Sequence, residues 1–506
     1  MSSRTKNSFR NSSVGSISQI ISTFLNFLVR TIFIYYLGSE YLGINGLFSN
    51  ILYILNFAEL GIGNAIIYKL YKPVANDDKE QIKTWIKFYR KIYMCIGIFV
   101  LIVGLLVIPF MPYIIKEAPN ISESLILIYL LYLLETAGTY FFGYKRSVFL
   151  VYERNYVNSL IDLSFSGLKS LIQALILVFT QNFILYLIVY VASTIISNIY
   201  ISIKANKEYP FLKEKTSLKI SKNEVKELWT NVKSLVMYKL GTTILSGTDN
   251  IIISMLIGIV AVGIYSNYSL IITAVSGVLW TVLTGLTGSI GNLNTTDDNK
   301  KQEKIYNQTL FISCMLYGFA GVMMLVLLKP FIVLWIGEEY LLDDITVILL
   351  IIVLYLRGIA FASNVYRDTL GLFKQGRLAP LFCSIINIML SVFLGKVMGI
   401  KGVFLATVIS ILITTFWYMP RIIYKEIFKT NFLNYFKKMI IFTIPFILSY
   451  CILYFIFINM PVGNIWILIL ESIITFLIIS VIIVLTTFFT DEFKEVKKKI
   501  LILKGR

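Results

Sequence analysis

The chain has 506 residues, of which 57% are hydrophobic and 15% charged, and its mean hydropathy is +0.78. This composition excludes a water-soluble globular protein and predicts an all-α polytopic membrane protein. The chain contains no histidine, which excludes Ser/His/Asp and Cys/His catalytic sites and His-ligated zinc. Its net charge of +18 is compatible with nucleic-acid binding or with membrane orientation, so the positions of the charges must decide.

Apolar runs of about 20 residues predict about fourteen transmembrane helices, because a bilayer crossing takes about that many residues. These runs start near Val14, Ile44, Tyr89, Leu125, Val157, Phe183, Val232, Ile264, Asn307, Ile345, Leu378, Gly402, Met439 and Asn464. The first run is too long, and carries Arg30 too deep, for a cleaved signal peptide. We therefore expect the N-terminal segment to be retained.

The lysines and arginines lie mainly on one side of the predicted membrane. Of the 46, 38 lie in the two tails and alternate loops, and only four lie in the opposite loops. The other four, Arg30, Lys169, Lys239 and Arg357, fall inside spans. This asymmetry predicts that both termini are cytoplasmic, and it favours contact with anionic lipids. The Lys-rich stretch between spans six and seven is then a solvated loop, and no nucleic-acid partner is expected.

The sequence repeats itself at an offset of 220 residues. Gly38, Gly43, Ile44, Ser49 and Ile51 are each identical to the residue 220 positions later. The repeat unit contains six spans, and an even number returns the chain to the same side, so the two copies are parallel repeats. We predict two six-helix lobes, residues 1–215 and 216–430, followed by a helix pair and a basic cytoplasmic tail in residues 431–506. Such a bundle places its substrate between lobes that rock to give alternating access.

Polar residues recur at helical spacing on the first span and so share one face. They are Gln19, Thr23, Asn26 and Arg30, and the repeat places Lys239, Thr243, Ser246 and Asn250 at the corresponding positions. Hydrogen bonds between packed helices would explain the uncharged members. A buried cation costs at least about 2.5–3.5 kcal/mol, so Arg30, Lys239 and Arg357 should face water or a counter-charge. Together with Asn26 and Glu59, they are our candidate substrate-binding residues.

Several acidic residues also fall inside predicted spans. Asp249 would neutralise a nearby lysine or bind a coupling cation, since hard cations prefer oxygen ligands. Asp162 and Lys169 lie seven residues apart and share a helix face, which we interpret as a structural charge network. Glu135 and Glu471 are weaker candidates for carboxylates that titrate, and the sequence names no partner for either.

Motifs for a cofactor or an energy source are missing from the sequence. The four cysteines lie singly in apolar runs, which argues against a disulfide framework or a metal cluster. No GxxxxGK[ST] motif occurs, so we expect no P-loop and no ATP hydrolysis. Energy would then come from an ion gradient, with Na⁺ or H⁺ as the coupling ion, from the membrane potential or from the substrate gradient. A cationic cavity would suit an anionic ligand, because arginine pairs bidentately with phosphate.

The segments 35–75 and 248–275, which carry the repeat, resemble the oligosaccharide flippases of bacterial polysaccharide biosynthesis. These flippases belong to a superfamily that also contains multidrug-and-toxin extrusion antiporters and the flippases of the lipid-linked peptidoglycan precursor. The resemblance covers essentially the whole chain. Its motifs are glycines and small residues at turns, so it informs about fold and family rather than about the sugars.

The resemblance implies a secondary transporter rather than an enzyme, located in the bacterial cytoplasmic membrane. Its substrate would be an undecaprenyl-pyrophosphate-linked oligosaccharide for a capsule or O-antigen type polysaccharide, moved from the cytoplasmic to the outer leaflet. The lipid tail would stay in the bilayer while the pyrophosphate and sugars cross the cavity. The polymerase and glycosyltransferases of the same pathway are the implied protein partners. Arg30 fits the family's tendency to place cations in the cavity, with Lys239 and Arg357 as companions.

The resemblance also implies a coupling-ion site. In some relatives a sodium site joins an acid on span seven, an Asn and an acid four residues apart on span eleven, and a Thr on span twelve. Asp249, Asn387 and Thr407 stand at comparable positions here and are candidate ligands. Ser391 stands where the second acid is expected, so strong sodium binding is not predicted.

Two other functions compete with the flippase. A multidrug:cation antiporter has the same fold, but Arg30 and Lys239 argue against a cavity for cationic drugs. A membrane glycosyltransferase or polymerase would use an acidic metal-sugar site on an outward loop, formed by Glu338, Glu339, Asp343 and Asp344. Such enzymes normally need a long external loop or domain, and every outward loop here is short.

Overall fold

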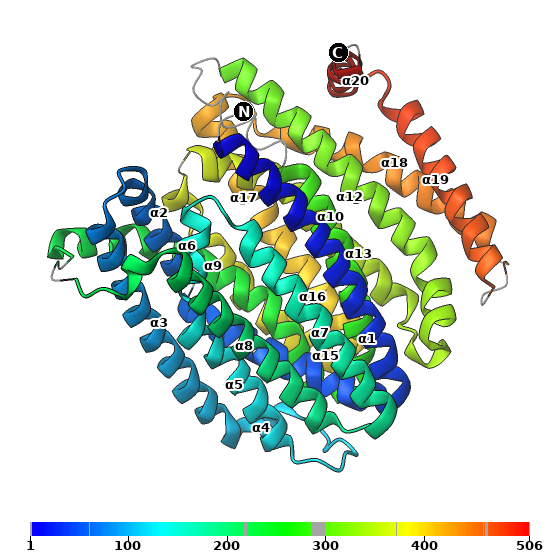
Figure 1. Cartoon of the computed structure of the whole chain (residues 1–506). Coiled ribbons are helices and arrows are strands. Elements are labelled where there is room, and N and C mark those ends of the chain that lie inside the picture. Colours follow the sequence, from blue (N-terminus) through cyan, green and yellow to red (C-terminus); the bar gives the residue numbers. More distant parts are fainter. Residues whose placement is uncertain are drawn as a thin grey trace. The chain divides into compact units, whose positions relative to one another are not determined.

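The computed structural model describes residues 3–59, 61–216, 218, 220–284, 299–370, 372–458, 460 and 464–504. Within these ranges every regular element is a helix or a single helical turn (Figure 1). Twelve of the described helices are long and apolar enough to cross a membrane. The predicted class, an all-α polytopic membrane protein, is therefore confirmed.

The chain divides into two compact units, Met1–Gly263 and Ile264–Arg506. The elements of the first unit are α1 (Ser3–Leu55), η1 (Asn56–Glu59), α2 (Ile62–Ala75), α3 (Lys79–Val107), η2 (Ile108–Phe110), α4 (Met111–Ile114), α5 (Leu125–Gly143), α6 (Arg146–Val151), α7 (Tyr156–Thr180), α8 (Phe183–Glu208), η3 (Pro210–Lys213), α9 (Lys222–Leu256) and the start of α10 (Ile259–Thr284). In this unit α1 packs along α7, and α5 packs between α3 and α8.

The second unit contains the rest of α10 and the helices that follow it. They are α12 (Asn299–Ile336), η4 (Glu338–Tyr340), α13 (Asp344–Leu370), α14 (Phe373–Gly376), α15 (Ala379–Met398), α16 (Ile400–Ile413), α17 (Thr415–Ile422), the π-helical η5 (Ile423–Phe428), α18 (Leu433–Phe457), α19 (Ile465–Thr487) and α20 (Asp491–Lys504). The pairs α12 with α13, α15 with α16, and α18 with α19 pack closely. The C-terminal α20 is tied to α12 by the Lys304–Glu495 ion pair at 2.8 Å.

Most predicted spans fall on one helix each. The two spans that start near Val14 and Ile44 instead lie in α1, on either side of Gly38. The span that starts near Val232 lies in α9, a helix of 35 residues that is not among the twelve apolar ones. By its contacts with α1, α2 and α4, α9 groups with the first unit, whereas the predicted boundary places it in the second lobe. The lobe boundaries stay a prediction.

The distribution of apolar and polar side chains is that of a protein in lipid. Phe179 and Phe455 are 79% and 76% exposed to the surroundings of the protein. Conversely, Gln173 and Asn198 are 2% and 3% exposed inside the first unit. In such a protein the apolar side chains on the outside face hydrocarbon. The polar side chains lie inside, where they have hydrogen-bond partners.

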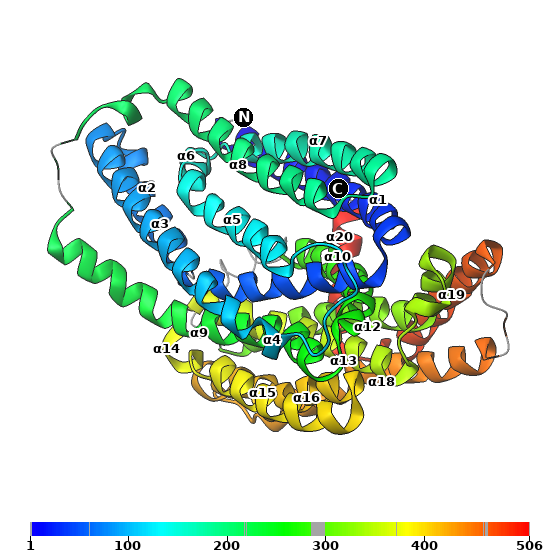
Figure 2. The ribbon, with the colours of Figure 1, turned by 90° about the horizontal axis from the view of Figure 1, so that it is seen from below.

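The repeat predicted from the glycines has a clear structural counterpart within the first unit. Gly38 has φ 78°, and Gly258, 220 positions later, has φ 135°; this left-handed backbone favours glycine. At Gly38 the chain turns sharply inside α1 (Figure 2). At the second pair of glycines, a Cβ on Gly43 would overlap the carbonyl of Ile259, and a Cβ on Gly263 would overlap that of Ser39.

These two contacts are equivalent, because Gly263 and Ile259 stand 220 positions after Gly43 and Ser39. The segment of α1 after Gly38 therefore crosses the start of α10 with backbone against backbone, and glycine is required on both sides. Small residues at a helix crossing are a common way to bring two membrane helices close together.

The connection before α9 is held to the first unit by side chains of α3. Lys83 forms an ion pair with Glu214 at 3.0 Å, and its own side chain is only 5% exposed. Next to it, the hydroxyls of Thr84 and Thr216 lie 3.0 Å apart. The Lys-rich linker predicted as a solvated loop is thus anchored at this point.

Candidate functional site

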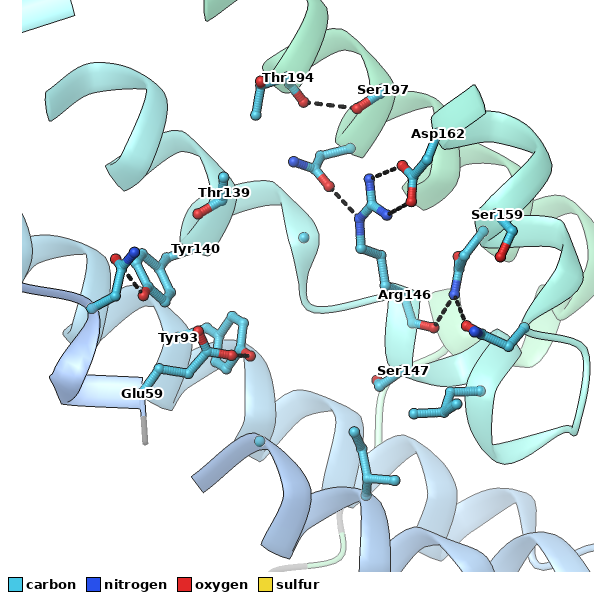
Figure 3. A pocket seen from close by; sticks show the side chains of 18 of the residues that line it. Glu59, Tyr93, Thr139, Tyr140, Arg146, Ser147, Ser159, Asp162, Thr194 and Ser197 are labelled. Carbon is cyan, nitrogen blue, oxygen red and sulfur yellow. Dashed lines mark hydrogen bonds and ion pairs between the residues drawn. The ribbon is translucent and has the colours of Figure 1, made fainter. Parts of the chain in front are cut away.

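A cavity of about 870 Å³ lies within the first unit. Its lining comes from η1, α2, α3, α5, α6, α7, α8 and α9, and polar groups dominate it. Figure 3 shows two groups of side chains on opposite sides of its open space. We call Arg146, Asp162 and Asn198 the arginine wall. The tyrosine wall consists of Asn56, Glu59, Tyr89, Tyr93 and Tyr140.

In the arginine wall, the guanidinium of Arg146 uses three of its nitrogens. Nη1 and Nη2 each donate to one carboxylate oxygen of Asp162 at 2.8 Å, which is a bidentate pair (Figure 3). Nε donates to the Asn198 side-chain carbonyl at 2.6 Å. The Arg146 side chain is 31% exposed and that of Asp162 is 49% exposed. The pair is therefore open to the cavity and accessible to a ligand.

The local backbone explains why Arg146 faces the cavity. Helix α5 ends at Gly143, beside the Asn198 side chain, whose oxygen would lie 3.4 Å from a Cβ at this position. The short α6 then starts at Arg146 itself. Asn158 on α7 donates to the Arg146 carbonyl and to the Asn155 side chain, both at 3.0 Å, which fixes the connection between the two helices.

A second cation, Lys169, lies farther along α7 and also lines the cavity. Its ammonium lies 5.3 Å from the ring centre of Tyr190, a cation–π distance, and it interacts electrostatically with Glu135. Glu135 on α5 accepts a hydrogen bond from Thr194 at 3.1 Å. Glu135, for which the sequence named no partner, thus belongs to a polar cluster at the edge of the cavity. Asp162, which we expected to share a network with Lys169, pairs with Arg146 instead.

The tyrosine wall is a hydrogen-bonded chain that ends on a carboxylate. Tyr89 donates to the Tyr93 hydroxyl at 2.9 Å. Tyr93 in turn donates to Glu59 (Figure 3). Tyr140 donates to the Asn56 side chain at 2.9 Å, and its ring packs edge to face on Tyr93 with 5.6 Å between ring centres. The three tyrosines are almost fully buried, and together with Asn56 and Glu59 they line the cavity.

Gly63 creates the space in front of this wall. A Cβ at Gly63 would lie 2.9 Å from the Tyr89 hydroxyl, 3.2 Å from the Tyr93 hydroxyl and 3.5 Å from Glu59. The three oxygens therefore converge on the position where any other residue would have its side chain. Just before it, Gly61 has φ 88° and turns the chain from η1 into α2.

Two of the predicted substrate-binding residues, Glu59 and Lys239, line this cavity. Asn26 and Arg30 lie on α1, and neither is among the lining residues. Arg30 interacts electrostatically with Tyr132 and Tyr186 in the same unit.

The remaining predicted residues lie mainly in the second unit. Arg357 is exposed on α13, and Glu471 is buried on α19. Asn387 donates to Thr407 at 2.9 Å and to Ser391 at 3.3 Å, and all three side chains are fully buried. Asp249 is buried on α9 of the first unit. An ion site that joins Asp249 to Asn387 and Thr407 stays a prediction.

Arg146 and the tyrosines were not predicted as site residues from the sequence. Arg146 was counted as a cytoplasmic loop residue, because it stands beside Lys145 between two apolar runs. A signal for the tyrosine wall did exist, since Tyr89 and Tyr93 are four residues apart and share a helix face. In the part of the chain that the structure describes, no cluster of three Cys, Asp or Glu residues is suited to hold a metal.

Comparison with known proteins gives the family. A family model described as "Polysaccharide biosynthesis protein" matches residues 8–286, more than half of the chain. The chain belongs to this family. The family resemblance expected from the glycine-rich segments is thereby confirmed. No curated protein matches the sequence.

Several solved structures of transporters share the fold of this chain. The lipid II flippase MurJ in an inward closed conformation is 19% identical, with 93% of this chain and 98% of that chain covered and a TM-score of 0.69. An inward-facing MATE family multidrug transporter of the MOP superfamily is 16% identical, with 81% and 98% covered and a TM-score of 0.62. A mutant of the Vibrio cholerae MATE transporter VcmN is 15% identical, with 85% and 99% covered and a TM-score of 0.54. This family member therefore has the MurJ and MATE fold.

Proposed function

We propose that this protein is a flippase that moves an undecaprenyl-pyrophosphate-linked oligosaccharide from the cytoplasmic to the outer leaflet, for a capsule or O-antigen type polysaccharide. The observation that carries the proposal is the set of three cations, Arg146, Lys169 and Lys239, around one polar cavity in a member of a polysaccharide biosynthesis family. A planar guanidinium binds phosphate oxygens bidentately, which an isolated ammonium does not. The lipid tail would remain in the bilayer while the polar head group enters the cavity.

The position of the cavity along the helices supports loading from the cytoplasm. Much of its lining comes from the end of α5, from α6, and from α7 up to Lys169 near its middle. With cytoplasmic termini, as the lysine and arginine distribution predicts, all of these segments lie in the cytoplasmic half of the membrane. Pathway glycosyltransferases and a polymerase would act before and after the transfer, and this chain itself would be a transporter rather than an enzyme.

The energy source is part of the same proposal. Asp249, Asn387 and Thr407 would form the coupling-ion site, with Na⁺ or H⁺ as the ion. The hydroxyl of Ser391 beside Asn387 supplies no negative charge, so we expect weak sodium dependence. Asn26, Arg30 and Arg357 would be further substrate-binding residues outside the lining of this cavity.

One observation favours a second candidate function, a multidrug:cation antiporter. Glu59 with three tyrosines is a set of groups that also suits a cationic drug, since aromatic rings and a carboxylate attract cations. Against this, Arg146, Lys169 and Lys239 line the same cavity. Even with the carboxylates of Glu59 and Asp162 the lining is net positive, which disfavours a cation, and so we place the flippase first.

The test is surface polysaccharide in a strain that lacks the gene, with lipid-linked intermediates assigned to a leaflet by an impermeant sugar-oxidising probe. We expect polymer to be lost and complete repeat units to accumulate on the cytoplasmic face. Complementation with Arg146→Gln should restore less than about a tenth of the wild-type polymer, because bidentate phosphate binding is lost. A matched control is Arg154→Gln, because Arg154 pairs with Glu208 at 2.6 Å, is 33% exposed and does not line the cavity.

Two results would contradict the proposal. If the deletion strain keeps its polymer and loses only drug tolerance, the antiporter function replaces the flippase. If incomplete glycans accumulate instead of complete repeat units, the protein acts in glycan synthesis.

A further inference from the structure

We propose that the tyrosine wall is a glycan subsite, which binds a sugar ring of the transported head group through that sugar's hydroxyl donors. The inference rests on the proposed function and assigns the opposite wall of the same cavity. The proposed function requires an anion site, which the arginine wall supplies. The tyrosine wall lies across the cavity from it and is chemically different (Figure 3).

The direction of the hydrogen bonds determines what the wall can recognise. Tyr89 donates to Tyr93, Tyr93 donates to Glu59 and Tyr140 donates to Asn56, so all three phenolic protons are used within the wall. Apart from the amide N–H donors of Asn56, what remains toward the cavity is acceptor capacity, on the carboxylate of Glu59 and on the lone pairs of the phenols. A ligand that fits must therefore supply several O–H or N–H donors in a small space, which a pyranose ring does.

The shape of the wall agrees with this ligand. The oxygens of Glu59, Tyr89 and Tyr93 converge on Gly63, where a Cβ would already lie 2.9 Å from Tyr89. Because the tyrosine rings are buried and packed on one another, with 4.4 Å between the centres of Tyr89 and Tyr93, the oxygens are held in place before the ligand arrives. A site of fixed acceptors rejects a ligand that lacks the matching donors, since its buried polar groups are then left unpaired.

The opposite wall decides between a sugar and a cation. Arg146, Lys169 and Lys239 line the cavity together with the carboxylates of Glu59 and Asp162, so the lining is net positive, which disfavours a cation. A neutral sugar is not repelled, and the phosphate joined to it would be attracted to Arg146. The two walls together suit one molecule with an anionic end and a hydroxyl-rich end, and they would set its orientation in the cavity.

The experiment separates the two walls. Glu59→Gln, Tyr93→Phe and Gly63→Ala are each expressed in the deletion strain, and surface polymer is measured together with the binding of inorganic pyrophosphate to the purified full-length protein. We expect each variant to lower export at least about tenfold, as for a site whose polar partners are lost, and to leave the pyrophosphate affinity within about twofold of wild type. Arg146→Gln should lower both quantities. The accumulated intermediate should be the complete lipid-linked repeat unit.

A matched control guards against a folding defect. Tyr129 is buried and donates to the Gly104 carbonyl at 2.9 Å, outside the cavity lining, so Tyr129→Phe should export normally. Variants are compared at equal membrane abundance and equal melting temperature. If Gly63→Ala proves unstable, Glu59→Gln and Tyr93→Phe, which keep the side-chain volume, carry the test.

Three outcomes would overturn the inference. Normal export by Glu59→Gln and Tyr93→Phe, with export lost in Arg146→Gln, would remove the wall from substrate binding while leaving the flippase intact. Weaker pyrophosphate binding in Glu59→Gln would assign the wall to the phosphate. Loss of tetraethylammonium binding in Glu59→Gln, with normal export, would make it a cation site. Polymer that persists in the deletion strain would instead refute the proposed function itself.

Discussion

Asp162 holds the guanidinium of Arg146 in the geometry that a phosphate would take. Both carboxylate oxygens accept from it at 2.8 Å, and the pair opens on the cavity. A ligand phosphate must therefore compete with an internal carboxylate for the same nitrogens. Such competition weakens binding of the ligand. It also helps the ligand to dissociate, and a transporter must release its substrate after moving it.

This competition predicts the effect of Asp162→Asn on anion binding. An exposed ion pair is worth about 0.2–1 kcal/mol, so its loss should raise the pyrophosphate affinity by up to about fivefold. Isothermal titration of the purified protein measures this change. Glu208→Gln, which breaks the similar pair with Arg154 away from the cavity lining, should have no effect. Weaker binding in Asp162→Asn would mean that Asp162 positions Arg146 rather than competing for it.

At the scale of helices, the crossing of α1 and α10 depends on two glycines. Gly43 faces the carbonyl of Ile259, and Gly263 faces that of Ser39. Because the obstacle is backbone, no rotamer change can make room for a methyl group. The two backbones would have to separate, and the packing around them would be lost.

We therefore expect Gly43→Ala to lower the free energy of unfolding by about 1–3 kcal/mol or more. Thermal unfolding of the purified protein in one detergent measures the change. Gly277→Ala on α10 is the matched control, because nothing lies within 4 Å of its Cβ position; there, alanine should stabilise the helix by about 0.5–1 kcal/mol. Equal melting temperatures for the two variants would show that the crossing is looser than the structure indicates.

Buried polar clusters show what the sequence reveals about helix packing. The residues Asn387, Ser391 and Thr407 stand at helical spacing on two neighbouring apolar runs, and the structure joins them by hydrogen bonds. The sequence shows that such residues share a helix face. It does not show which helix lies opposite, because that depends on how all the helices pack.

At the scale of the whole molecule, the orientation in the membrane determines the side from which the cavity would be loaded. The lysine and arginine distribution predicts that both termini and the linker before α9 are cytoplasmic. The same prediction places η4, between α12 and α13, on the outer side. If the molecule were inserted the other way, the cavity of the first unit would open toward the outside.

Cysteine labelling checks this orientation. In a variant whose four natural cysteines are alanines, Glu338→Cys should react with an impermeant maleimide in intact cells, and Lys222→Cys only after permeabilisation. Both positions are exposed on the protein. Reaction of Lys222→Cys in intact cells would reverse the predicted topology, and with it the proposed direction of loading.

The sequence by itself determined the class of the protein, its approximate spans and its internal repeat. The reason is that bilayer thickness, the cost of charge in hydrocarbon and the need for glycine at left-handed turns act locally on the chain. The spacing of the glycines alone therefore pairs Gly38 with Gly258 and Gly43 with Gly263.

Only the tertiary structure decided the site. Arg146 looks like a loop residue in the sequence, and it is a cavity residue because α5 ends at Gly143 and α7 packs beside it. Glu59 is part of a wall only because α3 and α5 bring Tyr93 and Tyr140 to it. A cavity depends on which helix faces meet, and contacts between residues far apart in the chain leave no local pattern from which to predict them.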